Sequence, residues 1–410
     1  MNENEKLKEI IRLGSEISTF QDLDILLEKI LYETKKIADA DAGTIYIKKN
    51  SNLIFTHAQN KTLSRRLPEG KKLIYSTFEL PVSEDSIAGY AALTGESLVV
   101  QDVYHISGKP YGFNKSFDEK ANYRTRAVMT VPLKNERSDI LGVMQIINPM
   151  DEEGKDREFT DEDRLYVDHF AGIASMILQK AQMTRALILR MIQMAELRDP
   201  KETGAHVNRV ASYSVEIYER WAQKRGIPKT QIQADKDVLR MASMLHDIGK
   251  VAISDLILKK PAKFSFEEYE IMKSHSYQGA KIFYYAQSKI DEVARDVALT
   301  HHENWDGSGY PGRVDILTGE AIETDSNGKP LTLKGEEIPL YGRIVALADV
   351  YDALSSQRVY KESWQEEDVL NEIKKLSGTK FDPEIVEIFF DIIDVIRSIR
   401  EKYPEGNHCK

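Results

Sequence analysis

The feature that most constrains this chain is a series of histidines and aspartates in its second half. The series contains two adjacent pairs, His246-Asp247 and His301-His302. Five of the nine histidines stand in this half beside apolar residues or at expected helix ends, namely His206, His246, His275, His301 and His302. A polar group is costly to bury in apolar surroundings unless something pairs it. We therefore expect these side chains to meet at a metal site around which the second half of the chain folds.

Carboxylates accompany the histidines. Asp247 is followed by Ile248, and Asp349 lies in another apolar run. Glu202 and His206 stand four residues apart, so both lie on one face if that stretch is helical. Each residue alone has an ordinary explanation, because a lone histidine is more often a core or surface residue and a Glu–His pair can simply share a helix surface. A metal cluster accounts for all eight residues together: Glu202, His206, His246, Asp247, His275, His301, His302 and Asp349.

The ligand types indicate the chemistry. Histidine and carboxylate without thiolate suit Fe, Mn, Zn or Co and argue against a structural zinc site. Two such ions about 3.5–4 Å apart can activate a water molecule and clamp a phosphoryl oxygen. Asp247 offers a carboxylate able to bridge two ions, and Gly249 is expected to end the helix that carries the His-Asp pair. Lys250 is expected to point a cation at whatever the metals hold. Phosphoester hydrolysis is therefore the first chemistry to consider.

Hydrophobic periodicity divides the chain into three parts. Residues 1–160 predict an α+β domain with flanking helices around one antiparallel sheet. Its expected helices cover 5–18, 22–38 and 86–94, and its expected strands cover 44–47, 53–57, 78–82, 97–100, 127–133 and 140–147. Residues 161–198 predict one long connecting helix. Residues 199–410 predict an all-α metal-binding domain with helices at 203–225, 231–247, 290–303, 341–354, 366–376 and 383–403, and with a capping box at 265–268.

The connecting helix repeats its apolar residues at close to 3.5-residue spacing, from Leu165 and Phe170 to Met194 and Leu197. That spacing favours pairing with the same helix of a second chain. We therefore expect a homodimer through residues 161–198 and the first domain. The alternative is a helix with one face packed on its own domain. A long helix in this place can pass a rotation or a register shift from one domain to the other.

Composition narrows the range of partners and compartments. The formal net charge of −10 argues against binding of a nucleic-acid polymer. The lone cysteine, Cys409, excludes an intrachain disulfide and a cysteine-based zinc site, and it fits a reducing compartment. The first residues are charged rather than apolar, and no run approaches the roughly 18 apolar residues of a membrane span. We therefore expect a cytoplasmic protein without a membrane segment.

Three stretches of the first domain stand out: Gly89-Tyr90-Ala91, Tyr123-Arg124-Thr125, and Leu141-Gly142-Val143 with Gln145-Ile146-Ile147-Asn148. Together they resemble a GAF domain, a small-molecule sensor module, over about residues 20–180. The resemblance implies a pocket for an unidentified small ligand near residues 101–124. A dimerisation module without a ligand is the alternative. Some GAF domains that bind cyclic nucleotides carry an Asn-Lys…Phe…Asp-Glu signature. The matching place here reads Asn148-Pro149, Phe159 and Asp163-Arg164, so Pro149 and Arg164 depart from it and argue against cyclic-nucleotide binding by that route.

A loop rich in glycine and proline follows the second histidine pair and runs from Glu303 to Gly312. With His301-His302 and Gly309-Tyr310-Pro311 in order, residues 185–400 resemble the HD-GYP phosphodiesterases, a subgroup of the HD metal hydrolases. These enzymes hydrolyse cyclic di-GMP, a bacterial second messenger. The resemblance implies that the eight residues above bind two or three divalent ions, Fe or Mn, with Asp247 bridging and Glu202 serving a third ion.

The resemblance also implies roles around the metals. His246, Asp247 and Lys250 would be catalytic, and the substrate would be held by Lys250, Asp306, Tyr310, Arg358 and Lys361. The Gly309-Tyr310-Pro311 loop would line the guanine side and dock protein partners. Val359 stands where the family usually has proline. Residues 313–335 are an extra segment, expected to form a hairpin beside the site.

These expectations describe a phosphodiesterase that cleaves cyclic di-GMP to pGpG, GMP or both, under the control of a GAF domain. One alternative is the same enzyme acting on a mixed cyclic GMP-AMP dinucleotide. Another is a receptor that binds the dinucleotide without turnover. A nucleotidase-like HD enzyme acting on mononucleotides is disfavoured by the Gly-Tyr-Pro loop.

Overall fold

In a computed structural model, the chain divides into unit 1, Met1–Arg185, and unit 2, Ala186–Lys410. The structure describes residues 3–68, 71–75, 78–196, 203–326, 328–356 and 364–404. None of the helices in this described part has the length and hydropathy needed to cross a lipid bilayer. The finer division into 1–160, 161–198 and 199–410 stays a prediction.

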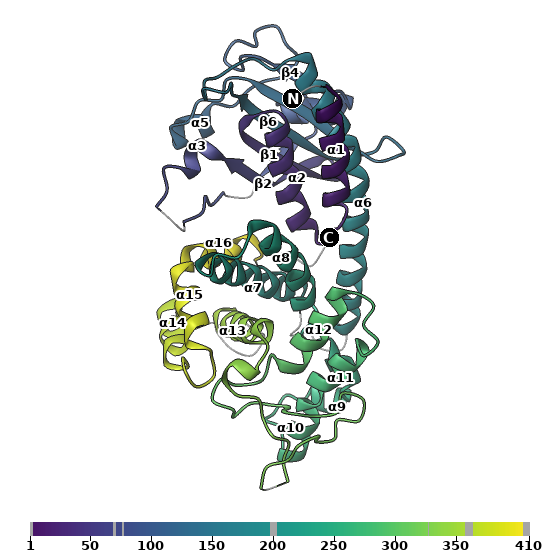
Figure 1. Ribbon diagram of the computed structural model, residues 1–410, viewed down its shortest axis with the longest axis vertical. Helices are drawn as coiled ribbons and strands as arrows, with labels where there is room; N and C mark the ends of the chain where they lie inside the picture. Colours follow the sequence, from purple (N-terminus) through teal and green to yellow (C-terminus); the bar gives the residue numbers. More distant parts are fainter. Residues whose placement is uncertain are drawn as a thin grey trace. The chain divides into compact units, whose positions relative to one another are not determined.

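Unit 1, Met1–Arg185, is built on one six-stranded sheet (Figure 1). Its strands are β1 (Ala40–Lys49), β2 (Asn52–Asn60), β3 (Glu79–Pro81), β4 (Leu98–Val100), β5 (Val128–Lys134) and β6 (Ile140–Pro149). They lie in the order β3-β2-β1-β6-β5-β4, and every neighbouring pair is antiparallel. The predicted α+β fold around an antiparallel sheet is confirmed, and each predicted strand overlaps an observed one.

The helices of unit 1 are explained by capping residues in the sequence and by packing against the two faces of the sheet. They are α1 (Glu3–Ile17), α2 (Leu23–Ile37), α3 (Lys61–Ser64), α4 (Ile87–Thr94), α5 (Ser116–Ala121) and the first part of α6 (Asp161–Glu196). The side chain of Asp22 caps α2 by accepting hydrogen bonds from two backbone amides of its first turn. Successive strand residues point to opposite faces, so Ile45 joins the core under α1, α2 and α6, and Tyr46 joins the cluster under α4.

Helix α6 is a single helix of 36 residues. In unit 1 its buried residues Phe170 and Leu178 belong to the core of the sheet domain. In unit 2 its residue Ile192 packs with Val207 and Met244. Another set of apolar side chains on α6 is exposed: Leu165, Met176, Met183, Leu187, Met191 and Met194. One face of the helix therefore packs within unit 1 along its first part and within unit 2 near its end. A second apolar face is exposed to solvent in the single chain.

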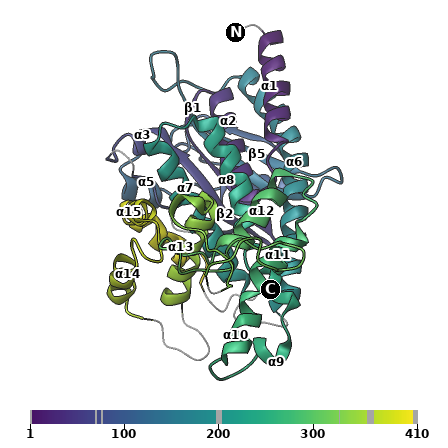
Figure 2. The same ribbon diagram turned by 60° about the horizontal axis from the view of Figure 1, so that its bottom comes forward.

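Unit 2, Ala186–Lys410, folds as helices around one apolar core (Figure 1). Its elements are α7 (Gly204–Lys224), α8 (Lys229–Ser243), the 3-10 helix η1 (Ile248–Ala252), α9 (Asp255–Leu258), α10 (Phe266–Lys273), α11 (His275–Ile282), α12 (Lys289–Thr300), the 3-10 helix η2 (Gly335–Glu337), α13 (Leu340–Ser355), α14 (Glu366–Lys375), α15 (Pro383–Asp391) and α16 (Ile393–Lys402). Helices α9 and α10 project beyond α11 (Figure 2). The predicted all-α architecture is confirmed, and so is the capping box of Ser265 and Glu268 at the start of α10.

Helix ends differ from the prediction at both histidine pairs. The helix predicted over 231–247 ends at Ser243, and residues 244–247 form turns before η1. The helix predicted over 290–303 ends at Thr300. The helix predicted over 383–403 is two helices separated at Ile392. At both pairs the chain leaves the helix early, so the histidines project from turns rather than from one helical face.

A buried ion pair holds the start of α6 in unit 1. Asp163, which is 4% exposed, accepts hydrogen bonds from both terminal nitrogens of Arg157 and from the backbone amide of Thr160. Arg157 also donates to the carbonyl oxygen of Ala38, the C-cap of α2. Asp163 therefore joins the start of α6 to the end of α2.

Removing this carboxylate should destabilise unit 1. We expect Asp163→Ala to lower its free energy of unfolding by about 2–4 kcal/mol, because Arg157 is left partly buried without its partner. All three tryptophans, Trp221, Trp305 and Trp364, lie in unit 2. Urea unfolding followed by far-UV circular dichroism should therefore shift while the tryptophan transition stays in place.

The control is Asp161→Ala, at an exposed position in the same helix turn. It removes one favourable charge from the N-terminus of α6 and should cost less than about 1 kcal/mol. Equal shifts for the two variants would contradict the role given to the ion pair.

Candidate metal centre

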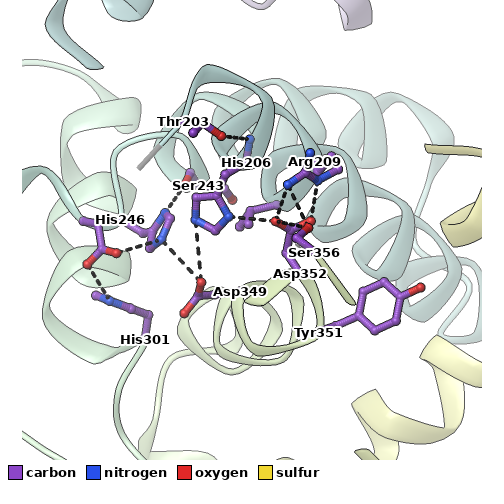
Figure 3. Close-up of polar contacts among 12 residues, drawn as sticks. Thr203, His206, Arg209, Ser243, His246, His301, Asp349, Tyr351, Asp352 and Ser356 are labelled. Atoms are coloured by element: carbon purple, nitrogen blue, oxygen red, sulfur yellow. Dashed lines mark hydrogen bonds and ion pairs between the residues drawn. The ribbon is translucent and has the colours of Figure 1, made fainter. Parts of the chain in front are cut away.

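Seven of the eight predicted ligands lie in the described part of the chain, and the structure gathers their donor atoms into two groups. The first group consists of Asp247, His275, His301 and His302, and the second consists of His206, His246 and Asp349. Within each group the donor atoms all lie within 4.8 Å of one another. Figure 3 shows the rings of the second group turned toward Asp349. The remaining predicted ligand, Glu202, lies outside the described residues, as do the predicted substrate residues Arg358 and Lys361.

The ligands come from helix ends and turns of unit 2 that are distant in sequence. His206 lies in the first turn of α7, and Asp349 lies within α13. The pair His246-Asp247 occupies the turn between α8 and η1. His275 begins α11 and His301 caps α12. Because α7, α8, α11 and α12 begin or end at the site and α13 passes beside it, the ligands approach from different directions.

Four of the histidines are oriented by a hydrogen-bond acceptor at Nδ1. The acceptors are the carbonyl oxygens of Ser243, Met272 and Val297 for His246, His275 and His301, at 2.8, 2.6 and 3.0 Å, and Oδ2 of Asp352 for His206, at 2.8 Å. These oxygens only accept, so Nδ1 carries the proton and Nε2 presents its lone pair. Metal-binding histidines in proteins adopt this arrangement.

Asp247 presents one carboxylate oxygen to each side of the centre. Its Oδ1 lies 3.1 Å from His275 Nε2 and 3.5 Å from His301 Nε2. Its Oδ2 lies 3.3 Å from His246 Nε2 and 2.7 Å from Lys250 Nζ. Burial raises the pKa of Asp247, but Lys250 and His246 outweigh this effect and leave the pKa well below its usual value. Asp247 is therefore an ionised carboxylate between two groups of imidazoles, with one oxygen facing each.

The polar atoms at the centre fit a cation. Asp247 Oδ1 and the Nε2 atoms of His275 and His301 are buried, and they make no hydrogen bond of acceptable geometry within the described residues. Burial lowers the pKa of His301, so this ring is neutral at pH 7 and its Nε2 is an acceptor. Acceptors that face one another at these distances repel unless a cation lies between them. Imidazole and carboxylate donors together fit a divalent metal ion.

Gly249 has a different role from the one predicted. It does not end α8, which has already ended at Ser243. A Cβ atom at Gly249 would stand 1.9 Å from the carbonyl oxygen of His275 and 2.4 Å from the amide nitrogen of Gly279. Only glycine allows η1 and α11 to approach this closely, and the approach brings Asp247 beside His275.

The loop after the second histidine pair covers the first group. The ring of Tyr310 stacks on that of His302, with centroids 4.8 Å apart and planes inclined by 29°. Asp306 is exposed and accepts a backbone amide of its own loop. The buried Glu303 accepts the amide of Gly312 at 2.6 Å and so closes the loop on its base. Residues 313–335, which follow, contain two isolated antiparallel bridges.

Two residues that were not predicted from the sequence hold His206, Asp352 directly and Arg209 through Asp352. Asp352 accepts hydrogen bonds from His206 and from Arg209 (Figure 3). Burial raises the pKa of Asp352, but these hydrogen bonds lower it to about 2, so the carboxylate is ionised at neutral pH. Arg209 follows His206 by three residues on α7, and Asp352 follows Asp349 by three on α13. A charged residue one helical turn from a predicted ligand is the signal that could have found both.

The close approach of the backbone at Gly249 can be tested by its effect on metal binding at the first group. Gly249→Ala should weaken binding of Mn(II) to the metal-free protein by about 10-fold or more, because the new Cβ atom pushes Asp247 and His275 apart. Isothermal titration calorimetry measures the affinity. Gly204→Ala is the matched control, since a Cβ atom there meets nothing within 4 Å. Equal affinities for the two variants would contradict the need for close approach.

The buried histidines should make the metal-free protein sensitive to acid. Burial lowers the pKa of His302 well below its usual value and also lowers that of His301. Both rings stay neutral in the folded unit at a pH where the unfolded chain, with histidine pKa values near 6.5, binds protons. In EDTA, the free energy of unfolding of unit 2 should therefore fall as the pH drops below about 6.5, by up to about 1.4 kcal/mol per histidine and pH unit.

Tryptophan fluorescence in urea follows this transition, because the tryptophans lie in unit 2. His302→Asn should reduce the slope of unfolding free energy against pH, since one depressed pKa is removed. The same slope in both proteins would show that His302 does not titrate in this way.

Comparison with known sequences identifies both parts of the chain. The sequence model of the GAF domain family matches residues 22–178, and that of the HD domain family matches residues 203–354. The GAF match covers the antiparallel sheet with α2 and the first part of α6. The HD match covers all seven described ligands and ends within α13.

Curated relatives match more than half of this chain. A protein of Vibrio cholerae named 3'3'-cGAMP-specific phosphodiesterase 2 is 36% identical over 231 residues, which are 56% of this chain and 39% of that protein. A cyclic di-GMP phosphodiesterase of Vibrio cholerae is 39% identical over 53% of this chain and 42% of its own length. One of Thermotoga maritima is 39% identical over 54% of this chain and 53% of its own length. The chain thus spans about half or less of these curated relatives, and its residues 22–178 and 203–354 match the GAF and HD domain families in that order.

Proposed function

We propose that this protein is a metal-dependent phosphodiesterase that hydrolyses cyclic di-GMP to pGpG, GMP or both. The observation that carries the proposal is Asp247, whose two oxygens face His275 and His301 on one side and His246 and Lys250 on the other. A carboxylate in this position suits a pair of divalent ions, which stabilise the attacking and leaving oxygens of an in-line displacement at phosphorus. The names of the relatives point to the same class of substrate.

The two ligand groups, with Glu202 for a third ion, would hold Fe or Mn. When bound, these ions supply Lewis acidity and activate water at neutral pH. Hydrogen-bond acceptors at the outer nitrogens hold the histidine rings in orientation. The neighbouring Lys250 keeps the carboxylate of Asp247 ionised. The ammonium of Lys250 lies 2.7 Å from Asp247 Oδ2, so we assign it to a phosphate oxygen of the substrate.

The substrate bases would be held by the loop after His302. Tyr310 offers an aromatic face of the kind on which guanine stacks, and it lies directly on the ring of His302. The exposed carboxylate of Asp306 is suited to accept a hydrogen bond from a base. We assign Arg358 and Lys361 to the remaining phosphate charge. The Gly309-Tyr310-Pro311 turn is also our candidate for contact with protein partners.

A mixed cyclic GMP-AMP dinucleotide is the second candidate substrate. It is favoured by the relative named 3'3'-cGAMP-specific phosphodiesterase 2, which is 36% identical to this chain. Both dinucleotides contain two phosphodiesters, so one metal centre serves either and the base contacts decide between them. A receptor without turnover is the third possibility, but it would need no complete set of inward-facing ligands.

We propose further that the GAF domain regulates the HD domain through α6 and binds a small ligand that is not identified. Met176, Met183, Leu187 and Met194 are exposed on α6 and recur at intervals of seven, four and seven residues. This heptad spacing suits pairing with α6 of a second copy. A homodimer formed in this way would let two GAF domains act on two HD domains together.

The first experiment is hydrolysis of cyclic di-GMP and of 3'3'-cGAMP by protein purified without oxygen and loaded with Fe(II) or Mn(II). We expect turnover of cyclic di-GMP, and we expect His246→Ala/Asp247→Ala to abolish it, a loss of at least about 1,000-fold in kcat for a metal-dependent site. Chromatography of the products separates pGpG from GMP and shows whether one or both bonds are cut.

Each other result selects an alternative. A higher kcat/KM for 3'3'-cGAMP than for cyclic di-GMP would make the mixed dinucleotide the proposed substrate. The proposed metal chemistry would be unchanged. Tight binding of cyclic di-GMP without turnover in either metal would favour the receptor. Asp163→Ala, which alters unit 1 and leaves the ligands intact, controls for a general loss of folding.

A further inference from the structure

His206 is held differently from the other oriented histidines of the metal centre. Its Nδ1 lies 2.8 Å from a carboxylate oxygen of Asp352, whereas the acceptors for His246, His275 and His301 are backbone carbonyl oxygens. Asp352 is 1% exposed, so water screens its charge very little. A histidine that donates to a carboxylate is fixed in one tautomer, and its other nitrogen becomes a more basic ligand.

Arg209 holds Asp352 in place from the opposite side. Its Nε and Nη2 lie 2.6 and 2.8 Å from the two carboxylate oxygens, the bidentate geometry that fixes both partners (Figure 3). Its Nη1 donates to the carbonyl oxygen of Tyr403, and Nη2 also donates to Ser356 Oγ, each at 2.9 Å. Asp352 therefore cannot rotate without breaking a buried ion pair, and one of its oxygens stays aimed at His206.

The inner nitrogen of His206 faces the second ligand group. Nε2 of His206 lies 3.7 Å from Asp349 Oδ1, and both atoms belong to the group completed by His246. Figure 3 shows the ring of His206 between Asp349 and Asp352. These two aspartates are one turn apart on α13, so α13 carries both a ligand and the carboxylate that orients its neighbouring ligand.

We infer that Asp352, held by Arg209, is a positioning residue for metal binding by His206, and that the second ligand group depends on it selectively. The inference rests on the proposed metal centre. The first group is expected to be insensitive, because His275 and His301 take their orientation from the backbone of α10 and α12.

The test is Co(II) binding by the metal-free full chain, followed by visible absorption without any dinucleotide. His206→Ala defines the absorption bands and the stoichiometry that depend on the second group. Asp352→Asn should weaken binding at those bands by about 10–100-fold and leave the remaining bands unchanged. Because Asp352→Asn removes the carboxylate that Arg209 contacts through two nitrogens, the double variant Asp352→Asn/Arg209→Met is measured beside it and should show the same selective loss.

Glu219→Gln is the matched control. Glu219 lies on α7, as His206 does, and it forms a buried ion pair with Lys236 at 2.5 Å. This variant should bind Co(II) like the wild type. Wild-type affinity at both groups in the double variant would overturn the inference, and so would an equal loss in Glu219→Gln, which would reveal a general effect of lost buried charge. Failure of the wild type itself to bind Co(II) would overturn the metal centre, and the proposed function with it.

Discussion

The carboxylate of Asp247, buried among imidazoles, is the interaction on which the second unit depends. Taking an ionised carboxylate and several neutral rings out of water costs several kcal/mol for the charge alone unless cationic partners compensate. Lys250 supplies one positive charge at 2.7 Å, and the two groups of donors are arranged to accept divalent ions. The helices of unit 2 end where this arrangement requires, α8 at Ser243 and α12 at Thr300. The apolar core between these helices holds their ends in place.

Orientation of the histidines is the second requirement, and the chain meets it in two ways. Backbone carbonyls at helix ends orient His246, His275 and His301, so their tautomers are set by secondary structure. His206 instead depends on Asp352, and Asp352 depends on Arg209. A backbone acceptor cannot be removed by one substitution, but a side-chain acceptor can. The two ligand groups therefore differ in how far single residues can tune them.

Helix α6 gives the proposed regulation a physical route. Phe170 belongs to the core of the GAF domain and Ile192 packs with residues of the HD domain, on one uninterrupted helix. A change in packing at one end of such a helix has a mechanical path to the other. The exposed methionines along it are adaptable side chains, which tolerate small shifts of a partner helix better than branched residues do.

The sequence by itself determined the order of domains, the α+β and all-α classes, and seven of the residues that meet at the site. Period-two and helical patterns are local, and histidines in apolar stretches need a shared partner wherever the helices lie. Only the tertiary structure decided that Gly249 serves close packing against His275, that Asp247 turns one oxygen to each group, and that Asp352 orients His206. These relations join residues on separate elements. Their distances depend on how the helices cross and where they end, and the periodicity of a single segment does not encode either.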